Sequence, residues 1–396
     1  MIESRAAFAD LLADLTEVGE RYAGGEWGLN EPGDVAEGLR VVLHHLANGI
    51  ETQFEQDPAR PSFRAMVTPW RKALGDNADA RYHDAPVHPA GTYRVRGRTA
   101  GAVYVSFTVE AGAEDGTFPS GTVGVLNDTG FDVGGDGSFE ITVGGPPRDR
   151  AWLPLAPDAS RLTVRHYWEA ERSPWQPPVP DLGLAIELVD GTDAVPAGPA
   201  APSDATVAAA IRRMGTYVRS RTLQIMARPG EADPPAFVSR LPHVFPAPVT
   251  PGAHALAAAD AAYSMAPYLL GPDDALVMRV RWPECRCANV SLWNRQLQTF
   301  DYLRNPVSLN RAQAPAGPDG TTTMVIAHRD PGVAHWLATE GRAFGMVFWR
   351  FMLPEGPIDT PTAEVVPLDA VRDTVAQTQG TVPQAPGSAT TPNASM

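Results

Sequence analysis

The sequence has little cysteine and no long apolar run. Among its 396 residues the only cysteines are Cys285 and Cys287. On a strand, residues spaced in this way point to the same face, which suits neither a loop-closing disulfide nor a four-ligand zinc site. We therefore expect two buried thiols and a cytoplasmic location, where thiols stay reduced. No segment approaches the roughly 20 apolar residues of a membrane-spanning helix, so no membrane partner is expected.

Basic residues are too few to make a cationic protein. The chain has 32 Lys and Arg against 46 Asp and Glu, a formal net charge of -14 at pH 7. Nucleic-acid phosphates and anionic membrane surfaces both attract basic faces. The charge balance therefore argues against a nucleic-acid partner and leaves a small molecule as a possible ligand.

The common cofactor and nucleophile motifs are also missing. No G-x-G-x-x-G opens a helix after a strand, and the sequence has no P-loop, H-E-x-x-H or G-x-S-x-G. One alternative stays open, a metal held by His328 and His335 together with Asp330. Otherwise we expect neither a metal nor a cofactor.

The chain does contain a long internal similarity. "DGSFEITVGGPPRDRAWLPLAPDASRLTVRHYW" (136–168) and "DGTTTMVIAHRDPGVAHWLATEGRAFGMVFWRF" (319–351) share an Asp-Gly turn, a strand, a proline-bearing loop, a Trp-Leu pair and a closing aromatic strand with an arginine. Upstream, "VLND" around Asn127 matches "SLNR" around Asn310. The constant order of these landmarks predicts an internal duplication and a pseudo-twofold within one chain.

Each copy has the pattern of a small β-sandwich preceded by helices. Apolar residues at i, i+3 and i+4 predict helices over 3–23, from a cap near Asp34 to Ile50, over 203–226, and over 252–270. We therefore predict an α+β protein with two tandem jelly-roll-like β-sandwich units. The predicted strands are Tyr93–Arg96, Val103–Val109, Ser138–Val143 and Leu162–Trp168 in the first copy, and Val277–Arg281, Ala288–Trp293, Thr321–Ala327 and Ala343–Met352 in the second.

Composition divides the chain into six parts. The linker is rich in Pro, Gly and Ala, and the tail is rich in Gln, Thr, Pro and Ser. The predicted parts are a helical segment (1–60), a first sandwich (61–189), a linker (190–203), a second helical segment (204–272), a second sandwich (273–372) and a disordered tail (373–396).

These landmarks resemble a known family. The run Asp-Gly, strand, Pro, Trp-Leu and a strand ending Arg-x-Tyr-Trp is similar to the C-terminal signature of a bacterial family of unknown function, found in two-domain β-rich proteins. "GDNADARYHDA" (75–85) and "YRVRG" are similar too. The resemblance covers most of 70–170 and, more loosely, 275–355. It implies a jelly-roll-like sandwich and no reaction, and here helices replace the companion domain.

The segment 75–85 is the first candidate for a polar site. It places Asp76, Tyr82 and His83 within a few residues, which could form a carboxylate–histidine pair or offer oxygen ligands to a cation. The alternative is a loop that ends a helix, with Gly75 as C-cap and the Asp and Asn residues as turn formers.

The closing strand of the first copy supplies the second candidate. Arg165 and His166 alternate in direction, and a histidine is a suitable general base near neutral pH. The second copy has Arg350 in this region and no histidine, which favours a special role in the first copy. The alternative is a hydrogen-bonded structural histidine.

Two functions stay open. One is a metal-independent enzyme that acts on a small apolar or aromatic molecule, with His166, His83, Tyr82, Asp76 and Arg165 as its acid–base residues. The other is a non-catalytic ligand-binding or scaffold protein that uses the duplicated unit. Trp152 and Trp336, at matching places, fit either the wall of an aromatic pocket or a core contact.

Overall fold

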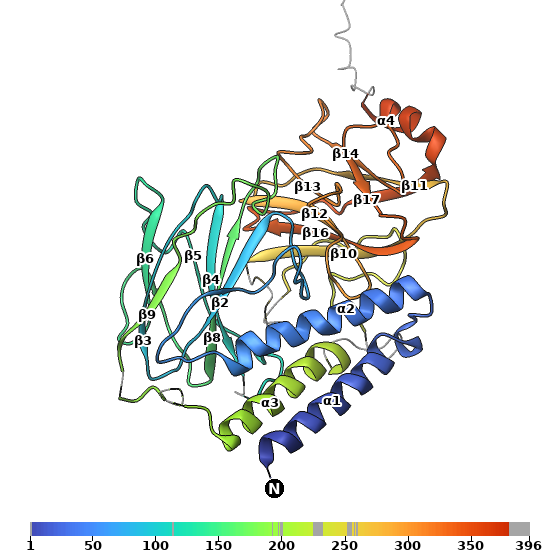
Figure 1. The fold of residues 1–396 in the computed structure, drawn as a ribbon. Helices are drawn as coiled ribbons and strands as arrows, with labels where there is room; N and C mark the ends of the chain where they lie inside the picture. Colours follow the sequence, from blue (N-terminus) through green and yellow to red (C-terminus); the bar gives the residue numbers. More distant parts are fainter. Residues whose placement is uncertain are drawn as a thin grey trace, which may run out of the picture.

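A computed structural model describes residues 2–112, 115–191, 193–196, 198, 201–224, 233–251, 256, 258 and 260–379. Within these ranges, three long helices lie along one side of two β-sandwiches, and a short helix lies at the far side of the second (Figure 1). The helices are α1 (Glu3–Tyr22), α2 (Pro32–Gly49), α3 (Asp204–Arg219) and α4 (Val371–Gln379), with 3-10 turns at Gly25–Trp27 and Leu368–Ala370 and π turns at Ile50–Phe54 and Ser220–Gln224.

The helices follow from the apolar spacing. α1 buries Ala7, Leu11 and Val18 along one face, and Ala7 and Leu11 pack in one apolar cluster with residues of α3. α3 begins where the sequence predicts, because the Ser203 side chain accepts the Thr206 N–H and the Thr206 hydroxyl bonds back to the Ser203 backbone. This reciprocal cap satisfies two N–H groups that the first turn leaves free.

The start of α2 differs from the expectation. Asp34, predicted as the cap, lies inside the first turn, and the helix begins at Pro32 with Glu31 as its N-cap. Proline suits this position because its fixed φ is helical and its missing N–H would have no partner there.

The first sandwich consists of two sheets that enclose one apolar core. Their strand orders are β1-β2-β8-β4-β5 and β7-β6-β3-β9. The strands are β1 (Arg64–Ala65), β2 (Ala80–Pro86), β3 (Thr92–Arg98), β4 (Tyr104–Ala111), β5 (Gly121–Asn127), β6 (Ser138–Gly144), β7 (Trp152–Leu153), β8 (Ala159–Tyr167) and β9 (Ala185–Asp190).

The second sandwich repeats this arrangement strand for strand. Its sheets have the orders β10-β16-β12-β13 and β15-β14-β11-β17, which match the first apart from the short β1. The parallel pair β6–β7 also has its counterpart in β14–β15. The strands are β10 (Ala261–Leu269), β11 (Asp274–Val280), β12 (Cys287–Trp293), β13 (Ser308–Asn310), β14 (Thr322–Ala327), β15 (Trp336–Ala338), β16 (Phe344–Met352) and β17 (Thr362–Pro367).

The α+β fold with two tandem sandwich units is thus confirmed, and the eight predicted strands all form. Two other expectations are wrong, one of a helix and one of a disordered tail. The described part of 252–270 forms β10 instead of a helix, because its backbone pairs with β16 from Ala261 to Leu269. Part of the predicted disordered tail forms α4, which packs Val371 into a core cluster. Residues 380–396 lie outside the described ranges.

The segment 75–85 is also more ordered than expected. The alternative interpretation, a loop that ends a helix, is wrong for its second half, which is β2 and pairs with β8 from Ala80 to Pro86. β2 is buried on both of its faces although it carries polar residues. One face looks into the first sandwich, and the other meets the second sandwich and the helices.

Candidate functional site

Four of the five predicted site residues lie on β2 and β8, on two sides of one sheet, and Asp76 lies before β2. Along β8, His166 points into the first sandwich, while Arg165 points outward to the second. Along β2, Tyr82 belongs to the apolar cluster between the sandwiches. His83 influences the pKa of His166 and so lies near it, on the inner side. The structure therefore separates the two histidines from Tyr82, Arg165 and Asp76.

His166 is enclosed by aromatic rings. It is fully buried, its Nε2 lies 3.1 Å from the carbonyl oxygen of Arg98, and its ring stacks on Trp168 at 5.9 Å between centroids. Burial lowers the pKa of His166 to about 3 and that of His83 to about 4. Both rings are therefore neutral at pH 7.

Arg165 belongs to a buried cluster of polar residues. Its guanidinium donates to Thr108 Oγ1 at 2.6 Å and to the Leu256 carbonyl at 3.1 Å, and it lies 3.7 Å from Glu110 Oε1. Arg165 and Glu110 are both buried. These contacts give Arg165 a structural role, in which it links the first half to the segment before β10.

Asp76 reaches across to the second half. Its carboxylate accepts the Thr299 N–H at 2.7 Å and the Thr299 hydroxyl. The same hydroxyl accepts from Lys72 Nζ at 2.9 Å, and Lys72 also donates to the carbonyls of Thr299 and Phe300 at 2.5 and 2.6 Å. Burial raises the pKa of Asp76 and lowers that of Lys72.

Asp79 is the centre of the polar contacts between the halves. It accepts from Asn310 at 3.0 Å and from Asn289 at 2.7 Å, and Asn289 also donates to Asn77 at 2.7 Å. Asp79 is 5% exposed, and this burial raises the pKa of Asp79 to about 6 although the two amides oppose the shift. It is therefore a carboxyl group that can change protonation near neutral pH.

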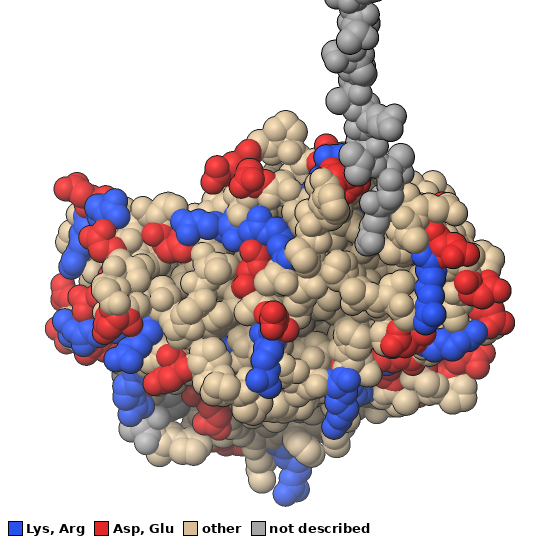
Figure 2. Space-filling model, turned by 90° about the horizontal axis from the view of Figure 1, so that it is seen from above, with Lys and Arg blue, Asp and Glu red and all other residues tan. Residues whose placement is uncertain are grey.

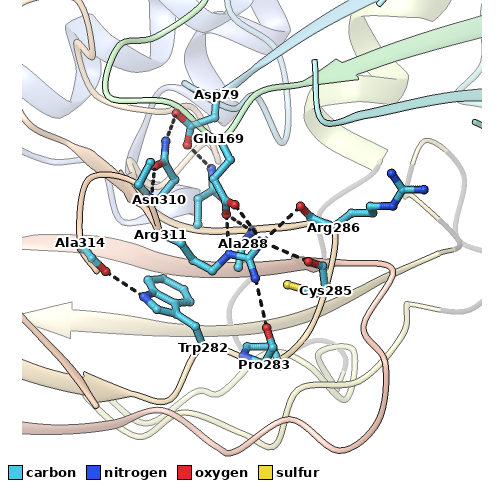
Figure 3. Close-up of polar contacts among 12 residues, drawn as sticks. Asp79, Glu169, Trp282, Pro283, Cys285, Arg286, Ala288, Asn310, Arg311 and Ala314 are labelled. Atoms are coloured by element: carbon cyan, nitrogen blue, oxygen red, sulfur yellow. Dashed lines mark hydrogen bonds and ion pairs between the residues drawn. The ribbon is translucent and has the colours of Figure 1, made fainter. Parts of the chain in front are cut away.

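A bidentate ion pair lies next to Asp79 (Figure 3). Arg311 donates to both carboxylate oxygens of Glu169, at 2.7 and 2.8 Å. It also donates to the carbonyls of Pro283, Cys285 and Arg286, so all three nitrogens of the guanidinium have hydrogen-bond partners. Glu169 follows β8 of the first sandwich and Arg311 follows β13 of the second, so this ion pair joins one half to the other.

These contacts recur on the other side with the halves exchanged. Asp260, directly before β10, accepts from Asn127 at 3.3 Å and from the Tyr104 hydroxyl, as Asp79, directly before β2, accepts from Asn310 and Asn289. We call this interface the seam. Its residues are Lys72, Asp76, Asp79, Glu169, Asn289, Thr299, Asn310, Arg311 and Arg350 on one side, and Tyr104, Asn127, Arg165 and Asp260 on the other.

An open cleft runs beside the seam on the Asp79 side. Its volume is about 280 Å³, and it lies between segments 171–176 and 302–309, with Ala78 and Asp79 on its floor. Amides and hydroxyls supply most of its polar groups. These are Gln176, Asn305 and Gln313, together with Ser173 and Ser308.

A small buried cavity lies on the other side of Asp79. Its volume is about 10 Å³, which is room for about one water molecule. Arg350 and Asn289 line it, and Nε and Nη1 of Arg350 and Oδ1 of Asn289 have no hydrogen-bond partner among the described residues. A water that accepts from Arg350 and donates to Asn289 would satisfy both side chains. Asp79 therefore separates a water-sized cavity from an open cleft.

Two residues of this region were not chosen from the sequence, although signals existed. Lys72 is the only lysine of the chain, and its side chain is buried. Asn310 was noted only as a landmark that matches Asn127. A lone lysine among arginines and a repeated asparagine both indicated a specific polar contact.

Several other features bear on function. Among the described residues no three His, Cys, Asp or Glu side chains gather as a metal site, and none of the helices seen there is long and apolar enough to cross a membrane. His328 bonds Thr339 at 2.6 Å, and His335 lies 3.2 Å from the Thr323 carbonyl. Both cysteines are free thiols. Basic and acidic side chains are intermixed on the face that Figure 2 shows.

The fold has a close counterpart among solved structures. An uncharacterized protein from Burkholderia cenocepacia is 27% identical, with a TM-score of 0.78 over 93% of this chain and 99% of that chain. A Vibrio parahaemolyticus protein is 10% identical over 90% and 99% of the two chains, with a TM-score of 0.43. Oxalate decarboxylase from Bacillus subtilis is 9% identical over 84% and 82%, with a TM-score of 0.19. No family model and no curated protein matches the sequence. The first likeness supports the fold over nearly the whole chain.

Proposed function

We propose that the protein binds a small polar organic molecule in the cleft, with Asp79 as the ionisable group at its floor. One observation carries this proposal. The residues that line the cleft of about 280 Å³ include Asp79, a buried acid whose pKa is raised to about 6 by burial. Ligand sites are typically concave and hold a few placed polar groups.

The lining supports a polar ligand over an apolar one. Gln176, Asn305 and Gln313 offer amide groups, and besides Asp79 the charged residues of the lining, Glu171 and Arg304, have opposite signs. Arg304 is paired with Asp301 at 2.7 Å. A ligand with hydroxyl or amide groups and no net charge fits this set.

An acid–base enzyme is the second form of the proposal. A carboxyl group that titrates near pH 6 can accept or return a proton in a reaction at neutral pH. Asp79 would then be the acid–base residue, in place of His166 and His83, for which the sequence predicts that role. The free thiols support the further proposal of a cytoplasmic location.

The seam supports the proposal of an internal duplication. The matched strand orders and the exchanged contacts of Asp79 and Asp260 are what two fused copies of one unit would produce. The cleft lies on the Asp79 side, so a duplicated unit would have specialised one of two equivalent sides.

The test is a thermal-shift screen of small polar metabolites on the full chain. A ligand of the folded state raises Tm by mass action. Gln176→Trp places a bulky ring in the cleft and should abolish the shift, whereas Leu43→Trp, on the exposed face of α2, should leave it unchanged. A ligand that shifts both variants equally binds elsewhere and refutes the proposal. Mass analysis of the bound compound after incubation separates binding from turnover.

A further inference from the structure

Trp70 presents a large apolar surface to solvent. Its side chain is 66% exposed, the highest exposure among the large hydrophobic residues of the described chain. It lies at the tip of a two-residue turn closed by Thr68 and Arg71, whose N–H groups donate to each other's carbonyls at 2.9 and 3.2 Å. The ring meets Trp175 edge-on, with centroids 6.3 Å apart.

This turn is held rigidly. Arg71 donates to the Ala65 carbonyl and forms an ion pair with Glu51, and Lys72 makes three hydrogen bonds to Thr299 and Phe300. An aromatic ring held in place loses little conformational freedom when a ligand binds. The exposure of Trp70 is therefore a fixed property of the surface.

The turn is also attached to both walls of the cleft. Trp70 contacts Trp175, the neighbour of Gln176 in the first wall. Lys72 Nζ lies 4.6 Å from the ring centroid of Tyr302 in the second wall. Trp70 therefore lies beside the first wall, next to residues that line the cleft, and offers an aromatic surface there.

We propose, on the basis of the proposed function, that the ligand is a neutral saccharide whose apolar ring face lies on Trp70 and whose hydroxyl groups bond the cleft amides. A sugar ring has an apolar face of C–H groups and a rim of hydroxyls. The first suits an aromatic side chain, and the second suits amide and hydroxyl partners. Of the charged residues that line the cleft, Arg304 is paired with Asp301, and a ligand charge of either sign would also meet a like charge, from this arginine or from the acids Asp79 and Glu171.

The experiment titrates the full chain with cellohexaose, maltohexaose and chitohexaose by calorimetry. We expect at least one of them to bind, and Trp70→Ala to weaken that binding about tenfold. Trp70→Phe should keep most of it. Leu43→Ala is the control, because Leu43 is 62% exposed on α2. Circular dichroism and Tm confirm that each variant is folded.

The outcomes separate this inference from the proposed function. Suppose that none of the three saccharides binds, but that a metabolite from the thermal-shift screen binds and Gln176→Trp abolishes its shift. The cleft is then a binding site, and the proposal of a saccharide ligand is refuted. Equal binding by wild type and Trp70→Ala also overturns the inference. If no ligand depends on Gln176, both proposals fail.

Discussion

Asp79 accepts a hydrogen bond from Asn310, and Asp260 accepts one from Asn127. Each aspartate directly precedes the first long strand of its own sandwich, and each asparagine ends a strand of the other sandwich. The two contacts are therefore the same contact with the halves exchanged, as in the interface of a symmetric dimer. The symmetry is imperfect, and its exceptions allow matched experiments.

Arg165 and Arg350 form the first matched pair. Arg165 donates to the Leu256 carbonyl, and Arg350 donates to the Gly75 carbonyl at 3.4 Å, each from one half to the other. Arg165 has the carboxylate of Glu110 beside it. Arg350 instead has aromatic neighbours: its Cζ lies 4.8 Å from the ring centroid of Phe348, and the Tyr263 hydroxyl is also near.

Methionine at these two positions should give unequal results. Arg165→Met leaves Glu110 buried without its cation and should cost about 3–5 kcal/mol. Arg350 has no carboxylate within ion-pair distance, and its removal also removes unsatisfied N–H groups, so Arg350→Met withdraws only a more distant attraction from Asp76 and Asp79 and should cost less, about 1–2 kcal/mol. Urea denaturation of both variants measures the difference. Equal losses would show that Glu110 does not distinguish the two arginines.

The sequence predicts the sandwiches well for a physical reason. Alternating residues, Asp-Gly turns and the Trp-Leu pairs are local signals, and both copies contain them. The same logic failed at β10, where an alanine-rich segment favours a helix by intrinsic propensity. Ala261, Ala262 and Ala266 are buried in the strand, and pairing with β16 overrides their propensity.

The site was harder to predict because it depends on contacts between the halves. Asp76 and Asp79 both lie in the segment chosen as polar, yet their partners, Thr299 and Asn310, are more than 200 residues away. One sequence does not indicate such pairs. His166 illustrates the opposite error, since its position on a strand was clear but its enclosure was not.

His166 should prove structural. It is fully buried and stacked on Trp168, so His166→Ala should leave a cavity and cost about 2–4 kcal/mol. His88→Ala, at a half-buried position, is the control and should cost under about 1 kcal/mol. Thermal unfolding measures both. A folded His166→Ala variant with unchanged Tm would favour a catalytic role instead.

Asp79 should couple stability to pH. Burial raises its pKa to about 6 from 3.8, so the native state holds this proton more tightly than the unfolded state. Its contribution to stability is therefore full below pH 3.8 and is lost as the pH rises through 6. The difference in unfolding free energy between wild type and Asp79→Asn should change by about 2 kcal/mol between pH 7 and pH 4, in favour of wild type at pH 4. A difference that does not vary with pH would mean that Asp79 titrates normally.

Lys72 offers a direct probe of the seam. It is the only lysine, so an amine-reactive ester can modify only this side chain and the amino terminus. Burial lowers the pKa of Lys72, which alone would make the amine more reactive. The side chain is 4% exposed, however, and its three hydrogen bonds tie it to Thr299 and Phe300, so reagent can reach it only when the seam opens.

Peptide mass spectrometry should therefore find Lys72 unmodified in the native protein and modified in urea. Asp76→Ala should speed the native reaction, because it removes the carboxylate that holds Thr299 in place. Leu43→Ala, at an exposed position of α2, should not. Rapid modification of the native wild type would show that the halves separate readily. The cleft would then lack the fixed walls on which ligand binding depends.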